Sequence, residues 1–294
     1  MDKYIKYFNT HQAYEDYIYS QSALFPNVSY CADTGHVHYN PTQPVRPETR
    51  VIATFNVKST TSNTKILSNV NNVSEIEIDG VVQQGRPTTY RFSTKGEHTV
   101  KYRLTDQTQI STVFMNYCDD ITSITIPDGV TTIGSNAFMG DYGLTSVTMS
   151  NTVTTIGERA FQTTNLSDVV WSENLTTIGS NAFPLTNLGQ STNGVVTIPN
   201  SVTTIGEMAF QRLDYMTQMY VGENVTSIGD NAFGTNSGMT SFTINALTPP
   251  TIGSELFYSH GQNFIIYVPA ASVDAYKAAN GWSTYASIIQ AIQD

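Results

Sequence analysis

The stretch Ile156-Gly157-Glu158-Arg159-Ala160-Phe161 decides the fold, because the chain repeats its pattern of Ile-Gly, two variable residues and Ala-Phe. Each copy begins with an isoleucine, at Ile110, Ile133, Ile156, Ile178, Ile205, Ile228 and Ile252. The first copy has lost its glycine, and the last copy has Leu in place of Ala. The intervals between these isoleucines are 23, 23, 22, 27, 23 and 24 residues. Such a period is typical of a solenoid, in which each turn packs only on its neighbours.

Each repeat contains a second apolar stretch, which precedes the Ile-Gly pattern. In Leu144-Thr145-Ser146-Val147-Thr148-Met149 the first, fourth and sixth side chains are apolar, and the last two follow the two-residue period of a strand. We therefore expect two strands in each turn and parallel ladders between turns. The glycine is expected to allow a bend in the backbone, since it has no Cβ. The pair Ala160 and Phe161 is expected to fill the core from a short helical turn.

The outward positions of the predicted strands form rows along the ladders. The second ladder shows threonine at each step, at Thr131, Thr154, Thr176, Thr203 and Thr226. The first ladder has two rows, Thr125, Thr148, Val170, Thr197, Tyr220, Thr243, Tyr267 and Ser123, Ser146, Asp168, Val195, Gln218, Ser241, Ile265. The β-propensity of threonine on solvent-facing strands is enough to explain these rows. The alternative is a flat binding face, whose candidate residues interrupt the threonine pattern: Asp168, Val170, Gln218, Tyr220 and Tyr267.

Outside the repeats, the sequence predicts three further segments. Residues 1–48 are expected to form an anchoring segment, with a short helix after Thr10, a hairpin and a stiff proline linker. Residues 49–105 alternate apolar and polar residues and are expected to form a small immunoglobulin-like β domain. The repeats fill residues 106–270, and residues 271–294 are expected to form a helical cap over the last turn. The predicted fold is mainly β, a β-solenoid of about seven turns with additions at both ends.

The distribution of charge limits the classes of partner. The net charge is −10, and residues 119–294 carry 14 acidic and three basic residues. An acidic repeat region repels phosphate, so we expect no nucleic-acid binding. No apolar run approaches the ~18 residues of a membrane span, so we expect no membrane insertion. The residues after Met1 lack the apolar core of a secretory signal.

The cysteines and histidines offer little chemistry. Cys31 and Cys118 show no metal spacing, and two thiols packed as small apolar side chains are favoured over a disulfide between them. His36 and His38 share one strand face but have no third ligand. We therefore expect no metal and no cofactor.

An enzyme needs convergent ionisable groups, and the strand rows hold one carboxylate, Asp168. The carboxylates in the turns lie about one repeat apart or more and are expected to be solvated. We therefore expect no enzymatic activity. A carbohydrate-active enzyme that uses Asp168 and Glu173 is the remaining catalytic alternative.

Two resemblances add to this interpretation. The unit of an L-x-x-I-x-I-P strand followed by V-T-x-I-G-x-x-A-F resembles the BspA-type leucine-rich repeat of bacterial surface and phage proteins, over residues 106–270. The run from Ile266 to Trp282 resembles the usual terminus of such arrays. The run from Leu24 to Pro41 resembles a segment in structural proteins of tailed, crAss-like phages of gut bacteria. The resemblance to the leucine-rich repeat implies a scaffold displayed on a surface. The resemblance of the run from Leu24 to Pro41 implies a place in a virion.

The sequence therefore predicts a non-enzymatic structural and binding protein. In the main hypothesis it is a virion component, such as a fibre, tail or capsid-decorating protein. Its N-terminal segment contacts other virion proteins, and its solenoid contacts a glycan or protein on the host surface. The candidate anchoring residues are Tyr30, His36, His38 and Tyr39. The alternative is a leucine-rich repeat adhesin on a bacterial cell surface, and a homo-oligomer stays open in both cases.

Overall fold

A computed structural model describes residues 28–31, 36–39 and 50–293. The chain divides into two compact units, residues 1–49 and residues 50–294. In the first unit, β1 (Val28–Cys31) and β2 (His36–Tyr39) pair antiparallel, so the two runs that the sequence predicts as a hairpin do pair. The predicted helix after Thr10, the proline linker and the side chains of the candidate anchoring residues lie outside the described part of the chain.

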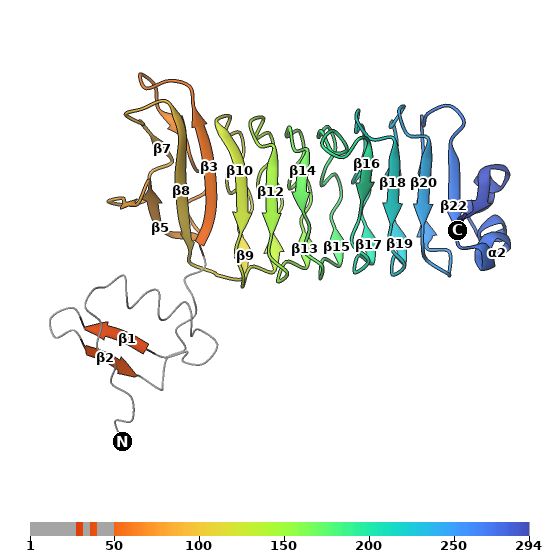
Figure 1. Cartoon of the computed structure of the whole chain (residues 1–294), viewed down its shortest axis with the longest axis horizontal. Coiled ribbons are helices and arrows are strands. Elements are labelled where there is room, and N and C mark those ends of the chain that lie inside the picture. The colour runs from red at the N-terminus through yellow and green to blue at the C-terminus, as the bar shows by residue number, and fades with distance from the viewer. Residues whose placement is uncertain (1–27, 32–35, 40–49, 294) are drawn as a thin grey trace. The chain divides into compact units, whose positions relative to one another are not determined.

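The second unit contains a solenoid with two ladders of parallel strands (Figure 1). The first ladder consists of β10 (Ile121–Ile126), β12 (Ser146–Met149), β14 (Asp168–Val170), β16 (Val195–Thr197), β18 (Gln218–Val221), β20 (Ser241–Ile244) and β22 (Ile265–Val268). The second consists of β9 (Gln109–Ile110), β11 (Thr132–Ile133), β13 (Thr155–Ile156), β15 (Thr177–Ile178), β17 (Thr204–Ile205), β19 (Ser227–Ile228) and β21 (Thr251–Ile252). With one exception, each strand pairs with its equivalent in the next repeat, in the predicted register.

The exception is an interruption of the first ladder between β14 and β16. There β14 is the edge of a seven-stranded sheet and β16 is the edge of a five-stranded sheet. The second ladder continues past the same place, because β15 pairs with β17. The interruption coincides with the 27-residue repeat from Ile178 to Ile205. In its extra loop, Asn187 N donates to Leu166 O at 2.9 Å, so loop backbone takes over part of the missing pairing.

The repeated glycine marks a close approach between turns and not the predicted bend. None of these glycines has a positive φ. A Cβ on Gly206 would lie 2.4 Å from Ser180 N, and one on Gly229 would lie 2.4 Å from Glu207 N. The copy without the glycine has Ser111, which follows β9, the terminal strand of the second ladder. Since no earlier turn packs there in that ladder, a side chain is tolerated at this one copy.

The segment after each glycine is a turn that lacks the helical conformation expected of the predicted short helical turn. Two residues of each turn have left-handed backbone, for example Arg159 with φ 55° and Thr163 with φ 60°. These conformations direct N–H groups to the next repeat, where Arg159 N donates to Ser180 O and Thr163 N to Pro184 O. The turn therefore adds a third line of inter-repeat hydrogen bonds, which a helix would have used internally.

The Ala-Phe pairs fill the core, as the sequence predicts. Consecutive phenylalanine rings from Phe138 to Phe233 stack with centroids 5.3–5.8 Å apart and planes 8–13° apart. Offset stacking of aromatic rings adds to the free energy gained by burying them. This column and the apolar strand residues form one continuous core.

Residues 50–104 continue the first ladder with antiparallel strands. The strands of this extension are β3 (Arg50–Val57), β5 (Val73–Ile78), β6 (Val81–Val82) and β8 (Gly96–Leu104), while β4 (Thr64–Lys65) and β7 (Thr89–Tyr90) pair with each other in a separate two-stranded sheet. β3 lies between β10 and β8, and β5 and β6 follow at the edge of the same sheet. Their buried side chains belong to the core of the solenoid. This region closes the end of the first ladder, and an immunoglobulin-like domain is not confirmed.

The C-terminal residues cover the opposite end of the solenoid. They form η1 (Ala270–Ser272), α2 (Val273–Ala278), η2 (Trp282–Ile288) and β23 (Ile289–Ala291). β23 pairs with β22 and completes the first ladder, while Tyr276 and Trp282 are buried against the last repeats. This arrangement is the predicted cap, built from short helices and one added strand.

Asp141 is the only buried carboxylate among the residues that the structure describes. Its Oδ1 accepts a hydrogen bond from Cys118 N at 2.7 Å, and its Oδ2 has no partner. Asn236 holds the equivalent place, where Oδ1 accepts from Leu213 N at 2.7 Å and Nδ2 donates to Phe233 O at 2.8 Å. Burial raises the pKa of the Asp141 carboxyl well above its usual range, against the opposing effect of the Cys118 N–H. A protonated Asp141 can donate where Asn236 does.

Candidate binding surfaces

Three of the five candidate residues lie on one sheet and form what we call the Tyr220 face: Gln218, Tyr220 and Tyr267. The strand register places Thr243 of β20 between the two tyrosines. Tyr220 is 37% exposed and its hydroxyl donates to Gln218 Oε1 at 3.2 Å, whereas Thr243 is buried. The two tyrosines therefore flank a position whose side chain is buried. Two aromatic rings with polar ends can contact a flat, partly polar ligand.

The other two candidates lie beyond the interruption of the first ladder. Asp168 and Val170 are on β14, at the edge of the seven-stranded sheet, and Val170 is 52% exposed. The sequence predicts one continuous row, but the 27-residue repeat divides it between two sheets. The structure therefore brings three candidates together and separates two from them.

The threonine row of the second ladder holds consecutive turns together. Thr154 Oγ1 donates to Thr131 O at 3.2 Å, and the N–H of Thr154 donates to the same carbonyl at 2.8 Å. The same hydroxyl bond recurs along the row, at Thr131, Thr176, Thr203 and Thr226. Because these hydroxyl protons are already donated within the ladder, the row contributes to the framework that holds the turns together.

The carboxylates nominated for catalysis do not gather around a site. Asp168 is exposed on β14. Glu173 is exposed in the corner that follows, that is, in the turn that leads from a strand of the first ladder to a strand of the second, and its N–H donates to Asn151 Oδ1. Within residues 50–293 and the two short N-terminal strands, no three His, Cys, Asp or Glu side chains are placed to hold a metal ion. In the same part of the chain, no helix has the length and apolar character to cross a membrane.

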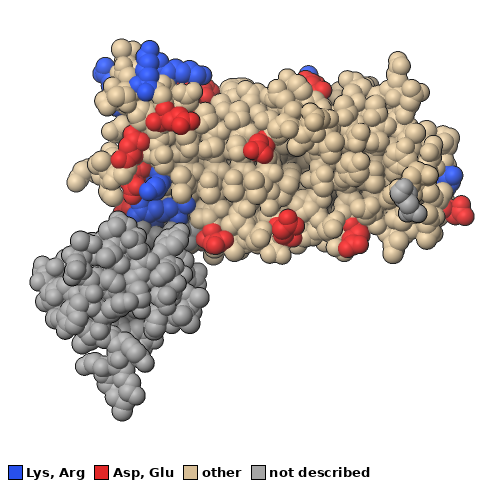
Figure 2. Space-filling model, viewed as in Figure 1, with Lys and Arg blue, Asp and Glu red and all other residues tan. Residues whose placement is uncertain are grey.

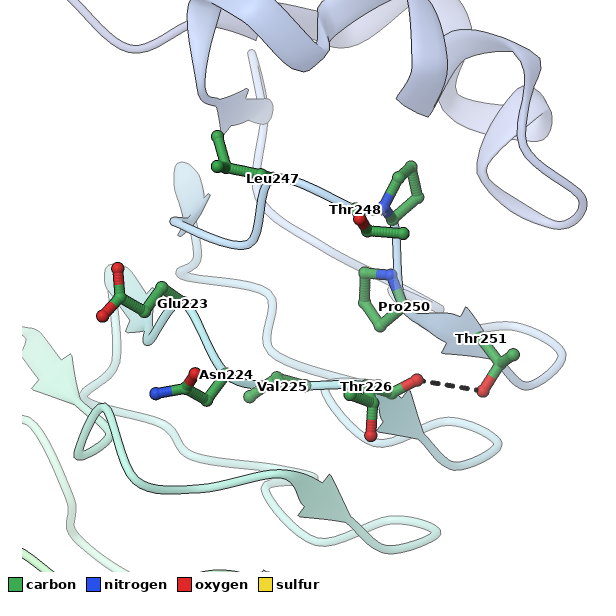
Figure 3. A pocket seen from close by; sticks show the side chains of 9 residues that line it. Glu223, Asn224, Val225, Thr226, Leu247, Thr248, Pro250 and Thr251 are labelled. Carbon is green, nitrogen blue, oxygen red and sulfur yellow. Dashed lines mark hydrogen bonds between the residues drawn. The ribbon is translucent and has the colours of Figure 1, made fainter.

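A cavity of about 500 Å³ opens between two consecutive corners, the corner that joins β18 to β19 and the corner that joins β20 to β21 (Figure 3). One side is the turn Glu223–Thr226 and the other is the loop Leu247–Thr251, and we call the space between them the corner notch. Leu247 is 69% exposed, and Glu223 and Asn224 are exposed on the opposite side. The notch combines an apolar wall with a solvated carboxylate.

Sequence reasoning missed the corner notch, although a signal was present. The register aligns Thr251 with Ser227, so Pro250 stands where the earlier repeats have the threonine of the second ladder. Proline has neither an N–H nor a hydroxyl to donate. The replacement of the row threonine by Pro250 therefore marks the place where two turns separate.

Charge is divided unevenly along the second unit. Residues 50–105 carry eight basic and four acidic residues, whereas residues 106–294 carry three basic and 15 acidic residues. Figure 2 shows basic side chains gathered over the end that contains β3, β5, β7 and β8, with acidic side chains spread along the repeats. The surfaces presented by the repeats therefore favour neutral or cationic ligands over anionic ones.

The stacked turns and the capped ends define a repeat protein of binding or structural type. The chain belongs to the family described as BspA type leucine rich repeat region, whose model matches residues 108–193 and 190–277 in six copies. The match begins at residue 108, so the resemblance of residues 24–41 to phage proteins gains no support from it. A search of curated proteins found no match.

Several solved bacterial structures are similar to the chain. A leucine rich repeat protein of T. pallidum has 20% identity and a TM-score of 0.41, and the match covers 49% of this chain and 66% of that one. One from Eubacterium ventriosum has 18% identity and a TM-score of 0.41, with coverages of 57% and 63%. A leucine rich cell surface protein of Faecalibacterium prausnitzii has 20% identity and a TM-score of 0.30, covering 60% of each chain. The chain thus spans less than two thirds of the length of these proteins.

Proposed function

We propose that this chain is a non-enzymatic recognition scaffold that binds a surface glycan or protein through the Tyr220 face. The observation that carries the proposal is a contrast between the ladders: the second keeps a threonine row bonded from turn to turn, whereas two tyrosines interrupt the threonine row of the first. A rigid framework reduces the ordering cost of binding, because the ligand-contacting side chains are already held in place.

The place of display is the finer part of the proposal. A cell-surface or extracellular location agrees with membership of the repeat family. A virion component is the more specific alternative, and it rests on the resemblance of the N-terminal segment alone. In both cases the N-terminal unit is the proposed anchor, and the repeats face the target. The neighbouring genes distinguish the two, because virion genes lie together.

The test is binding of the full chain to immobilised glycans and to intact bacterial cells. The double variant Tyr220→Ala with Tyr267→Ala removes both rings of the Tyr220 face, and we expect its Kd to rise about tenfold or more. Tyr258→Ala is the matched control, because Tyr258 is 59% exposed but lies in a turn. Equal binding by the double variant, the control and the unmodified chain would overturn the Tyr220 face as the site.

A further inference from the structure

The corner notch is the place where an otherwise continuous line of side-chain hydrogen bonds between corners stops. Asn174 Nδ2 donates to Asn151 O at 2.8 Å, Ser201 Oγ to Leu175 O at 2.7 Å and Asn224 Nδ2 to Asn200 O at 2.9 Å. Among the residues that the structure describes, no hydrogen bond joins Glu223 or Asn224 to residues 246–250. The corners separate at this step alone in the series from residue 151 to residue 250.

Proline explains why the two corners part. In the preceding step, Thr226 N donates to Thr203 O at 2.9 Å. In the next step Pro250 has no N–H, and only Thr251 bonds Thr226 O, through its N–H at 3.0 Å and its hydroxyl at 3.2 Å (Figure 3). The repeat from Ile228 to Ile252 has 24 residues, so the loop is also longer by one residue than in the preceding repeat.

The cap holds the outer wall of the notch in place. Tyr276 OH donates to Ala246 O at 2.8 Å, Ser272 Oγ to Leu247 O at 2.7 Å and Trp282 Nε1 to Pro250 O at 2.8 Å. These bonds secure the loop backbone on the side of the cap. Leu247 nevertheless stays 69% exposed. A fixed backbone lowers the ordering cost of any contact that this exposed side chain makes.

The chemistry of the walls selects the ligand. Leu247, which is exposed, and Pro249, which is half-buried, can cover an aliphatic stem, and the exposed carboxylate of Glu223 on the other side of the notch can pair with a positive end group. The excess of acidic residues over the repeats disfavours an anion at this place. Lysine and arginine are the side chains that combine an apolar stem with a positive head.

We propose that the corner notch binds an arginine or lysine side chain on a basic segment of a partner protein. The proposal depends on the role of the chain as a recognition scaffold, but not on the Tyr220 face. The partner's stem packs on Leu247 and Pro249, and its head pairs with Glu223. The notch is thus a second, charge-selective contact that adds to whatever the Tyr220 face binds.

The test is a titration of the full, isotope-labelled chain with a hexa-arginine peptide, followed by the amide chemical shifts. We expect the largest changes at residues 223–226 and 247–251, and at least tenfold weaker binding of a hexa-citrulline peptide, which has nearly the same shape without charge. Glu223→Gln should weaken arginine binding about threefold, as expected for one exposed ion pair. Glu207→Gln, at another exposed carboxylate in a different turn, should change it little.

Three outcomes would overturn the proposal: shifts spread over all acidic positions, equal binding of the citrulline peptide, or equal effects of the two glutamate variants. Spermidine is run in parallel, because equal notch shifts with this free amine would assign the site to a polyamine instead. The Tyr220→Ala with Tyr267→Ala variant should keep its arginine binding. The two proposals can therefore fail separately. Cell binding by this variant reports on the Tyr220 face, whereas the amide shifts at residues 223–226 and 247–251 report on the corner notch.

Discussion

The two ladders of the solenoid are built from the same repeats but differ in regularity. The second ladder runs unbroken through seven strands, with threonine hydroxyls bonded from turn to turn and glycines pressed against the preceding backbone. The first ladder is interrupted between β14 and β16, and its outward residues vary. Backbone contact at close range leaves no room for sequence change, whereas a solvent-facing position allows it. The second ladder therefore maintains the shape, and the first can diversify for recognition.

The most direct way to break this comparison is to add a methyl group to the second ladder. In Gly206→Ala the new Cβ would lie 2.4 Å from Ser180 N and 2.6 Å from Gly179 C, which are backbone atoms that cannot move without separating the turns. We expect a loss of about 3 kcal/mol in the free energy of unfolding, the upper range for overpacking. Chemical denaturation measures it. Ser111→Ala, at the terminal turn, is the control and should cost less than about 0.5 kcal/mol. Equal losses would show that the glycine is not needed for close approach.

Asp141 allows the comparison to be extended to pH. Its pKa is raised by burial, so the folded chain holds a proton that the unfolded chain releases near pH 4. The contribution of the neutral acid to stability is therefore full below about pH 4 and is lost as pH rises toward the raised pKa. The groups that act on this carboxyl are Cys118, Lys65 and Asp119, and its charge acts in turn on the Tyr102 hydroxyl.

We expect Asp141→Asn to match the unmodified chain near pH 4 and to be more stable by about 1–3 kcal/mol at pH 8, because an amide fills the same place without a charge. Thermal unfolding between pH 4 and 9 measures the difference. Asp168→Asn, at an exposed carboxylate, should show no such growth with pH. A difference that is constant over this range would mean that Asp141 does not carry the proton.

The sequence predicted the parts of this fold that depend on period and polarity. The two ladders, their register and the buried Ala-Phe pairs follow from apolar spacing, which each strand repeats. It did not predict what depends on distances between turns. The prediction that the glycine allows a bend is wrong, because the clash that an added Cβ would make with the preceding turn appears only once the turns are stacked. The prediction of a short helical turn is wrong because nothing in the sequence shows that residues such as Arg159 have a left-handed backbone conformation.

The candidate site shows the same division. Gln218, Tyr220 and Tyr267 could be placed on one face by counting residues, and the structure keeps them on one sheet. The row position of Asp168 and Val170 could also be counted, but the 27-residue interval does not reveal that the extra loop separates two sheets. The corner notch depends on a missing donor at Pro250, and a missing hydrogen bond becomes visible only beside the bonds that its neighbours make.

The smallest expected effect compares one threonine from each ladder. Thr203 Oγ1 donates to Thr176 O at 3.2 Å, whereas Thr125 is exposed on β10 and its hydroxyl has no partner among the described residues. Valine keeps the branched shape of threonine, so it preserves β-propensity and removes only the hydroxyl. Thr203→Val should cost about 0.5–1 kcal/mol, since Thr176 O keeps its two N–H donors, and Thr125→Val should cost close to nothing. Urea denaturation of both variants measures the difference. Equal costs would mean that the hydroxyl row adds nothing to the ladder, and that threonine is present there for its backbone preference alone.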